Sequence, residues 1–298
     1  MKLIAPKYYN EFKCIADKCT HSCCVGWEID VDCDTLKKYS ACEHSYGKEI
    51  RNSIDCKDTP HFRLCEGERC PHLDKNGLCN IITHLGEDYL CDICREHPRF
   101  YNETPHGMEV GLGMACEEAC RIILNSSEYD CFVEITPSSK ETEVTSFDPT
   151  LERAYIYSLL KDYSLSYEDR LKSIYNRYRV SPFALSDDKW RKIICSLEYL
   201  DESHKELFSS YSSSASAPKE TEKELERALA YFIYRHCSEA YDYGELCAGL
   251  GFCLFCERLL CSLAEKRPDE ILTLARIVSE EIEYSIDNTQ QIKEEFLF

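Results

Sequence analysis

The distribution of cysteine limits most strongly what this chain can fold into. Fifteen of the 21 cysteines lie within residues 1–131, in short-spaced groups separated by turn residues, and six lie in the remainder of the 298 residues. A chain of this length can bury most of its apolar surface without covalent staples, so its size does not require disulfides. The thiols of the first part therefore need another explanation.

The start of the chain indicates the redox environment of these thiols. The segment "MKLIAPKYYNEFKC" has one apolar triplet followed by charges, unlike a secretory signal peptide, and no run in the chain approaches 18 apolar residues. The sequence therefore predicts a cytoplasmic protein without a membrane partner. In that compartment thiols stay reduced unless a metal binds them.

Net charge excludes one class of partner. The formal charge is −19, and acidic residues outnumber basic ones on both sides of residue 131. Such a surface repels a phosphate backbone, so we expect no nucleic-acid partner. An acidic surface favours cationic partners such as lysine-bearing protein segments, although it also serves solubility alone.

Residue patterns predict a mainly α fold in two parts. Residues 1–133 form an irregular, cysteine-rich, metal-binding domain, residues 134–150 form a linker that could begin with a short strand, and residues 151–298 form a helical bundle. Apolar residues recur at helical spacing throughout the last part, as in "YEDRLKSIYNRY". The serine-rich stretch 209–220 is predicted to be a mobile loop within the helical part.

Two segments have the spacing of a helix-capping box. Ser166 with Asp169, and Thr221 with Glu224, each precede an apolar-periodic run. Pro268 is expected to open the last helical region.

Thiol spacing in the first part favours a metal. The groups are Cys14, Cys19, Cys23 and Cys24; Cys65, Cys70 and Cys79; Cys91 and Cys94, followed by His97; and Cys116 with Cys120. Short-spaced thiolates suit soft metals, and a structural zinc or an iron–sulfur cluster needs about four of them. The spacing matches no zinc-finger template, and adjacent cysteines fit a polynuclear centre or the boundary of two centres better than a single ion.

These motifs resemble those of the flagellin lysine-N-methylase family. The segments "YYNEFKCIADKCTHSCCVGWEIDVDCDTLKKY", "CPHLDKNGLCNIITHLGEDYLCDICREHPRFY" and "GLGMACEEACRIIL" are similar to the family's cysteine-containing elements. The first half is also similar to a broader group of zinc- or iron-chelating domains with a C-x-x-C-x-x-C-C signature. Beyond residue 124 the resemblance is diffuse.

The resemblance implies an iron–sulfur protein that transfers methyl groups from S-adenosylmethionine to lysine side chains of flagellin. One or two clusters, of the 4Fe-4S type, are implied, with zinc as the alternative. The cysteines that match the family are Cys14, Cys19, Cys23, Cys24, Cys70, Cys79, Cys94 and Cys116. Cys65, Cys91 and Cys120 have no assigned counterpart, and Glu280 stands where the family has an arginine.

Methyl transfer to lysine needs a neutral amine, and an acid or a tyrosine can accept its proton or orient its nitrogen. Through the resemblance alone, Glu281, Glu283 and Tyr284 are candidates for this role. The simpler interpretation is that they lie on a solvated helix face. The chain has neither a radical C-x3-C-x2-C signature nor a G-x-G-x-x-G between a strand and a helix.

Arg99 and Trp27 are candidates for cofactor binding. Arg99 could hold a carboxylate bidentately or form a structural ion pair. Trp27 is expected to pack over the metal centre or, less simply, to serve as a platform for substrate. His97 is either a ligand beside Cys94 or an ordinary hydrogen-bonded histidine.

The cysteines of the helical part are expected to be small buried hydrophobes. They are Cys195, Cys237, Cys247, Cys253, Cys256 and Cys261. A second hypothesis for the whole chain is a noncatalytic zinc- or iron-binding, or metal-trafficking, module fused to a helical interaction domain.

Overall fold

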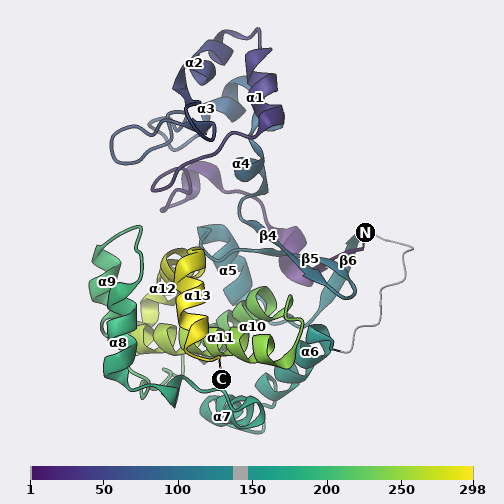
Figure 1. Ribbon diagram of the computed structural model, residues 1–298, viewed down its shortest axis with the longest axis vertical. Helices are drawn as coiled ribbons and strands as arrows, with labels where there is room; N and C mark the ends of the chain where they lie inside the picture. The colour runs from purple at the N-terminus through teal and green to yellow at the C-terminus, as the bar shows by residue number, and fades with distance from the viewer. Residues whose placement is uncertain (1, 137–146, 298) are drawn as a thin grey trace. The chain divides into compact units, whose positions relative to one another are not determined.

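The computed structural model describes residues 2–136 and 147–297, and its backbone forms two compact units (Figure 1). The small unit comprises Lys13–Pro98, and the large unit comprises Met1–Phe12 with Arg99–Phe298. This division differs from the predicted boundary at 134–150, because the first strand of the chain pairs with strands that follow residue 98. Residues 137–146 of the predicted linker lie outside the described part.

The small unit is built from short elements around a small core. Its helices are α1 (Cys33–Ser40), α2 (Ser45–Ser53), α3 (Asn80–Leu85) and α4 (Asp92–Glu96), with 3-10 turns η2 (Ala16–Lys18) and η3 (Glu87–Tyr89) and paired strands β2 (Ile54–Asp55) and β3 (His61–Phe62). The buried core is Ile29, Val31, Tyr39, Tyr46, Ile50, Ile54, Phe62, Cys70, Ile81 and Cys91. Short elements and long connections agree with the predicted irregular character of this segment.

One carboxylate organises two helices of the small unit. Asp32 Oδ1 accepts the N–H of Thr35 at 2.8 Å, which caps α1. Its Oδ2 accepts the N–H of Asp92 at 2.9 Å, at the start of α4. Because a capping side chain satisfies N–H groups that the helix leaves unpaired, Asp32 fixes the two helix starts relative to each other.

A four-stranded mixed sheet forms one side of the large unit. The strands β1 (Leu3–Pro6), β4 (Arg99–Thr104), β5 (Gly107–Leu112) and β6 (Phe132–Thr136) lie in the order β4-β5-β1-β6. β5 pairs antiparallel with β4 and parallel with β1, and β6 pairs antiparallel with β1. β6 corresponds to the strand that the sequence allows near residue 134, whereas no sequence pattern indicated β1, β4 or β5.

The remainder of the large unit is helical. Its helices are α5 (Glu117–Asn125), α6 (Pro149–Leu160), α7 (Tyr167–Tyr178), α8 (Asp187–Ser196), α9 (Ser203–Phe208), α10 (Glu222–Cys237), α11 (Tyr243–Ala264), α12 (Ile271–Val278) and α13 (Ile286–Glu294). Shorter turns are η1 (Lys7–Glu11), η4 (Pro182–Ala184), η5 (Pro268–Glu270) and a π-helical turn, η6 (Ser279–Glu283). The mainly helical character is confirmed, with the small sheet in addition.

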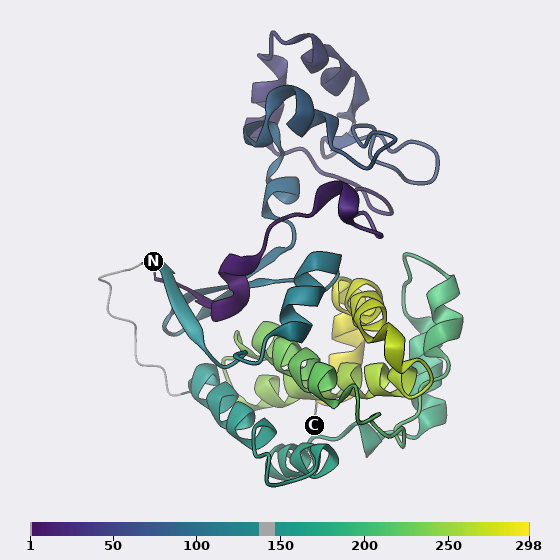
Figure 2. The same ribbon diagram turned by 180° about the vertical axis from the view of Figure 1, so that it is seen from behind.

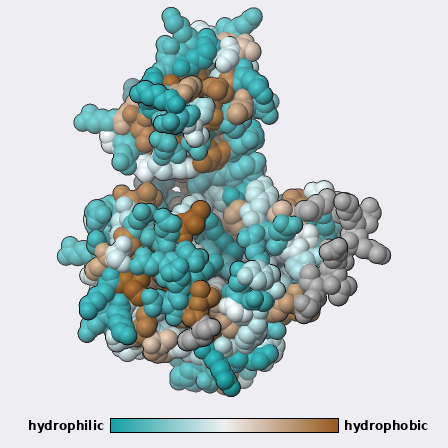
Figure 3. Space-filling view, in the orientation of Figure 1, coloured by the Kyte–Doolittle hydropathy of each residue, from teal (hydrophilic) through white to brown (hydrophobic). Residues whose placement is uncertain are grey.

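Helix α11 is the centre of the large unit. It packs against α10, α12 and α13. Helix α5 contacts α10 and α12, and Figure 2 shows this region from behind. Every residue from Leu246 to Ala264 is buried. By length and composition α11 could cross a membrane, but its apolar stretch is wholly enclosed within this unit. Hydrophilic side chains cover most of the face in Figure 3, which is consistent with an apolar interior.

The cysteines of the helical part mostly follow the expectation. Cys237, Cys247, Cys253, Cys256 and Cys261 are buried in the core, whereas Cys195 on α8 is exposed. The prediction of a buried hydrophobe is therefore wrong for Cys195, which lies on the solvent side of an amphipathic helix.

Of the two predicted capping boxes, the side-chain cap of the first forms, at Ser166. Ser166 Oγ accepts the N–H of Asp169 at 3.2 Å and donates to the Asp169 carboxylate at 2.7 Å. The hydroxyl of Thr221 instead donates to the carbonyl of Pro218 at 3.1 Å and does not cap α10. Local backbone geometry before α10 redirects the Thr221 side chain.

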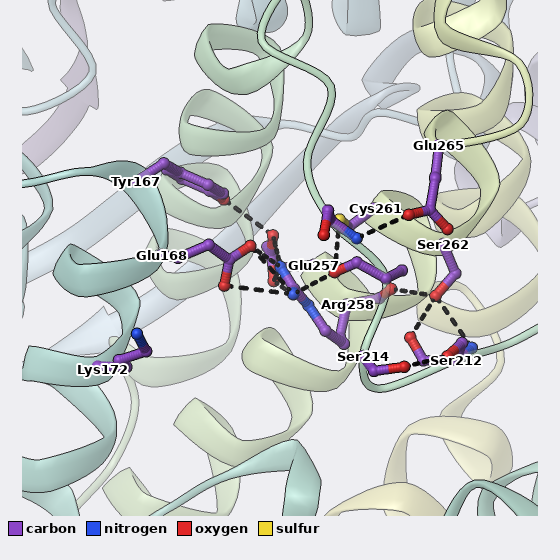
Figure 4. Close-up of polar contacts among 12 residues, drawn as sticks. Tyr167, Glu168, Lys172, Ser212, Ser214, Glu257, Arg258, Cys261, Ser262 and Glu265 are labelled. Atoms are coloured by element: carbon purple, nitrogen blue, oxygen red, sulfur yellow. Dashed lines mark hydrogen bonds and ion pairs between the residues drawn. The ribbon is translucent and has the colours of Figure 1, made fainter.

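The serine-rich stretch is held against α11 rather than left without contacts (Figure 4). Arg258 donates to the carbonyl of Ala215 at 2.9 Å, and Ser262 Oγ donates to the carbonyl of Ser212 at 2.7 Å. Glu265 accepts the N–H of Ser216 at 3.0 Å. The guanidinium of Arg258 is itself paired with Glu257 at 3.0 Å. These contacts contradict the predicted mobile loop, because buried polar groups of α11 supply partners that serine content alone does not reveal.

Candidate functional site

Five cysteines of the small unit lie in its core or packed against it, and we call them the thiol cluster: Cys24, Cys70, Cys79, Cys91 and Cys94. Backbone contacts bring them together. The N–H of Cys70 donates to the carbonyl of Cys24 at 2.9 Å. Cys79 pairs through its backbone with Leu73, and both Cys79 and Cys91 immediately precede helices.

Sulfur atoms in the thiol cluster are close and shielded from water. Cys91 Sγ lies 3.5 Å from Cys94 Sγ, one helical turn apart at the start of α4. Cys70 and Cys91 are buried, and Cys24, Cys79 and Cys94 are half-buried. The Tyr39 ring packs in the same core, with its hydroxyl donating to the carbonyl of Tyr89 at 2.7 Å.

The thiols of the cluster influence one another's ionisation. A hydrogen bond from Cys23, with help from Ser22 and the charge of Arg69, lowers the pKa of Cys24 to about 7 despite burial. Burial, followed by the nearby Cys24, Cys79 and Cys91, raises the pKa of Cys70 to about 12. Contact with Cys91, together with burial, raises the pKa of Cys94. Several thiolates can therefore coexist here only when a cation stabilises them, as a metal does.

The donor set of the thiol cluster suits zinc or an iron–sulfur centre. Within residues 2–136 and 147–297, however, no group of three or more His, Cys, Asp or Glu side chains has an arrangement that could hold a metal ion. The residue types of the cluster thus fit such a centre, although the described side chains are not arranged as a complete ligand set.

The structure brings together four of the eight cysteines named from the family motifs. The other four lie elsewhere or at the margin. Cys14 and Cys23 are exposed and Cys19 is half-buried, with Cys23 adjacent to the cluster through Cys24. Cys116 belongs to the large unit, directly before α5.

Cys91 is a member of the cluster that the family motifs did not supply. Its C-x-x-C spacing with Cys94 was the available signal, since this spacing at a helix start places two sulfur atoms side by side. Of the other two unassigned thiols, Cys65 is exposed, and Cys120 is in the core of the large unit.

Trp27 lies beside the cysteine-rich segment. Its indole N–H donates to the carbonyl of Cys23 at 2.6 Å, and its ring is 6.1 Å from that of His97. This position agrees with packing over the cysteine segment.

A second polar group surrounds Glu283 in the large unit. Its side chain is fully buried and binds four side chains: Tyr231 at 2.8 Å, His236 at 3.0 Å, Arg235 at 3.1 Å, and Ser279. Burial alone would raise the pKa of Glu283, but Arg235 and these hydrogen bonds hold it below the usual range. Burial lowers the pKa of His236 to about 4, so a neutral imidazole donates to the carboxylate.

Tyr284 follows the π-helical turn and meets the start of α5. The guanidinium carbon of Arg235 lies 4.6 Å from the centroid of the Tyr284 ring. A Cβ on Gly113 would stand 2.0 Å from the Tyr284 hydroxyl, so only glycine leaves room for it. Although 39% of Tyr284 is exposed, loss of hydration raises its pKa, and the hydroxyl stays protonated near neutrality.

Glu281 is not part of this group, although it is also buried. Its oxygens accept the N–H groups of Leu200 at 2.7 Å and Asp201 at 3.1 Å, and contact His204 Nδ1 at 2.6 Å. The reading of a solvated helix face is therefore wrong for Glu281 and Glu283, because the π-helical turn changes which side chains face inward.

Arg99 lies at the start of β4 and contacts aromatic residues. Its Nε donates to the Tyr9 hydroxyl at 2.9 Å, and its guanidinium carbon is 5.8 Å and 5.7 Å from the Tyr9 and Phe12 rings. These contacts give Arg99 a structural role in joining η1 to β4.

Comparison with known proteins identifies relatives of this chain. The flagellar biosynthetic protein FliU of Salmonella muenchen is 29% identical over 134 residues, which cover 41% of this chain and 77% of that protein. Lysine-N-methylases of Salmonella typhimurium and Salmonella choleraesuis are each 26% identical over 202 residues, covering 63% of this chain.

The matches have a limited extent. The aligned region spans 48%, or about half, of the length of each lysine-N-methylase. No protein-family model matches the chain, and no solved structure matches it. The identities of 26–29% over these lengths nevertheless agree with the resemblance seen in the cysteine motifs. This chain is a distant homologue of the Salmonella lysine-N-methylases and of FliU.

Proposed function

We propose that this chain is a protein-lysine N-methyltransferase that uses S-adenosylmethionine and acts on flagellin or a similar surface protein. The observation that carries the proposal is the similarity over 202 residues to proteins named lysine-N-methylase. The flagellar name of FliU supports flagellin as the substrate. An acidic chain of net charge −19 also suits a lysine-bearing protein partner.

The thiol cluster is the part of the chain suited to the iron–sulfur centre of this proposal, with zinc as the alternative. Cys24, Cys70, Cys79 and Cys94 would hold it, and Cys91, whose Sγ lies 3.5 Å from Cys94 Sγ, is a fifth thiol of the same cluster. Such a centre, when bound, supplies electron transfer if it is an iron–sulfur cluster, or structural stability if it is zinc.

The group around Glu283 supplies positioning rather than a free base. Glu283 stays ionised, and its oxygens are occupied by four donors. It fixes Arg235, whose guanidinium packs on the Tyr284 ring. The protonated Tyr284 hydroxyl can accept a hydrogen bond from an uncharged lysine amine, and this bond would orient the nitrogen lone pair toward the methyl donor.

Coexpression with flagellin tests the proposed reaction. Intact-protein mass spectrometry should show added methyl groups on flagellin lysines when the wild-type chain is present. Cys94→Ala should abolish this modification. Cys195→Ala, which alters an exposed thiol on α8, should retain it.

Anaerobic purification with iron, zinc and acid-labile sulfide analysis identifies the metal. Iron with sulfide supports a cluster, and zinc without sulfide supports the structural alternative. A metal-loaded chain that neither binds S-adenosylmethionine nor methylates lysine would contradict the methylase proposal and favour a metal-binding module.

A further inference from the structure

A pocket of about 410 Å³ lies in the large unit and shares Arg235 and His236 with the group around Glu283. Its wall comes from the end of α10, the connection to α11, the first turns of α11, and α13. This volume falls in the range of roughly 300–1,000 Å³ typical of small-molecule sites.

The pocket lining carries both signs of charge. Arg235 and Lys293 supply cations, and Glu239 and Glu245 supply carboxylates. No ion pair involves Lys293 within residues 2–136 and 147–297, so this ammonium is available to a ligand anion. His236 also lines the pocket, and because burial lowers its pKa to about 4, it adds no charge near neutrality.

The two carboxylates are held in place by the backbone. Glu239 Oε1 accepts the N–H of Glu103 at 2.9 Å, and Glu245 Oε2 accepts the N–H of Tyr241 at 3.3 Å. Each contact uses one oxygen of its carboxylate. The other oxygen of each can accept hydrogen bonds from a ligand ammonium.

Apolar and aromatic side chains complete the wall. Ala240, Ala248, Tyr241 and Leu297 line the pocket, and Tyr241 and Leu297 are 73% and 55% exposed. A ligand with a zwitterionic end and a flat, partly apolar body is complementary to this lining.

We propose that this pocket binds S-adenosylmethionine through its amino-acid end, with the carboxylate toward Lys293 and Arg235 and the ammonium toward Glu239 and Glu245. The inference rests on the proposed function and adds to it a binding site for the methyl donor. Arg235 connects the pocket to the group around Glu283, since this residue lines the pocket while its guanidinium pairs with Glu283 at 3.1 Å and packs on Tyr284.

Binding of S-adenosylhomocysteine to the purified full chain, measured by isothermal titration calorimetry, tests the inference separately from turnover. Lys293→Met and Glu239→Gln should each weaken binding by about tenfold or more, because each removes a charged partner of the zwitterion. Lys189→Met, on α8 outside the pocket, should bind as wild type does. Thermal unfolding of each variant checks that it is folded, and Lys293→Gln provides a second substitution.

Two further ligands identify which part of the donor is recognised. Adenosine lacks the amino-acid end, so its weaker binding should be the same in wild type and variants. Free methionine should bind much more weakly than S-adenosylhomocysteine; equal affinity would overturn the assignment to the methyl donor.

Unchanged affinity for S-adenosylhomocysteine in both Lys293→Met and Glu239→Gln would overturn the pocket while leaving the proposed methylase intact. A wild-type, metal-loaded chain that binds neither S-adenosylmethionine nor S-adenosylhomocysteine would overturn the pocket and the proposed function together.

Discussion

The two units of this protein differ in what holds them together. The large unit encloses a long apolar helix, α11, among other helices, and its core includes six buried cysteines that serve as small apolar side chains. The small unit has a core of ten buried apolar residues, two of which are cysteine, with three further thiols packed at its edge. The same residue type therefore fills space in one unit and gathers as potential ligands in the other.

This contrast suggests different sources of stability. Small domains bury a lower fraction of their surface and often depend on metals or other staples. We expect the small unit to depend on its thiol chemistry and the large unit to be stable without it.

Metal removal should give the largest difference between the units. A chelator should expose backbone amides throughout residues 13–98 to hydrogen exchange, because structural metal binding supplies about 10 kcal/mol to small domains. Amides of α10 and α11 should keep their protection. Hydrogen exchange with mass spectrometry measures both units in one sample. Retained protection in the small unit would contradict its proposed dependence on a metal.

Truncation of the α11 core should destabilise the large unit strongly. Phe255 is fully buried, 4.6 Å from the Trp190 ring, so Phe255→Ala should cost about 3–5 kcal/mol. Leu151→Ala, at a side chain that is 69% exposed, should change stability little. Urea denaturation measures both, and similar midpoints for the two variants would be inconsistent with an α11-centred core.

Acid should destabilise the large unit through His236. Burial lowers the pKa of His236 to about 4, whereas the unfolded chain takes up the proton near 6.5. The stabilisation is therefore fully present above pH 6.5 and is lost as pH falls toward 4, by about 3 kcal/mol. His236→Gln should flatten the dependence of unfolding free energy on pH in this window; an unchanged slope would assign the effect to other groups.

Gly113→Ala should impair activity more than stability. The added Cβ would displace the Tyr284 hydroxyl, and misplacement of a group that orients substrate can cost about 100-fold in rate. The measurement is the initial rate of lysine methylation. Gly244→Ala, where a Cβ meets only the Asp242 side chain at 3.3 Å, serves as the control. Wild-type rates in Gly113→Ala would remove Tyr284 from the proposed site.

Helix capping should produce the smallest effect. Ser166 Oγ accepts an N–H at the start of α7, so Ser166→Ala should cost about 1 kcal/mol. Ser186 precedes α8 without a side-chain cap, and Ser186→Ala should therefore cost less. Thermal unfolding of the two variants compares them directly, and equal losses would argue against the cap.

Sequence patterns predicted the helical part well because its apolar stripes are long. Leu171, Ile174 and Trp190 are all buried as their spacing requires. The sheet was largely missed, since β1 has only four residues and its partners lie about a hundred residues later in the chain. Such non-local pairing has no local signature.

The candidate site was predictable in part for similar reasons. Short spacing identified Cys70, Cys79 and Cys94, but a choice guided by motifs left out Cys91. Glu281 and Glu283 were named together through the family resemblance, whereas the π-helical turn directs them to different partners, His204 and Arg235. Helical periodicity of 3.6 residues does not describe a π turn.

The contact of Arg99 with Tyr9 and Phe12 has a consequence for the evolution of this architecture. It holds the two ends of the large unit's interrupted chain close together, so the small unit is an insertion domain whose attachment points are fixed by its host. Each doubling of an inserted segment's length adds only about 0.6 kcal/mol of closure entropy. The large unit can therefore accept shorter, longer or chemically different insertions between η1 and β4 with little loss of its own stability.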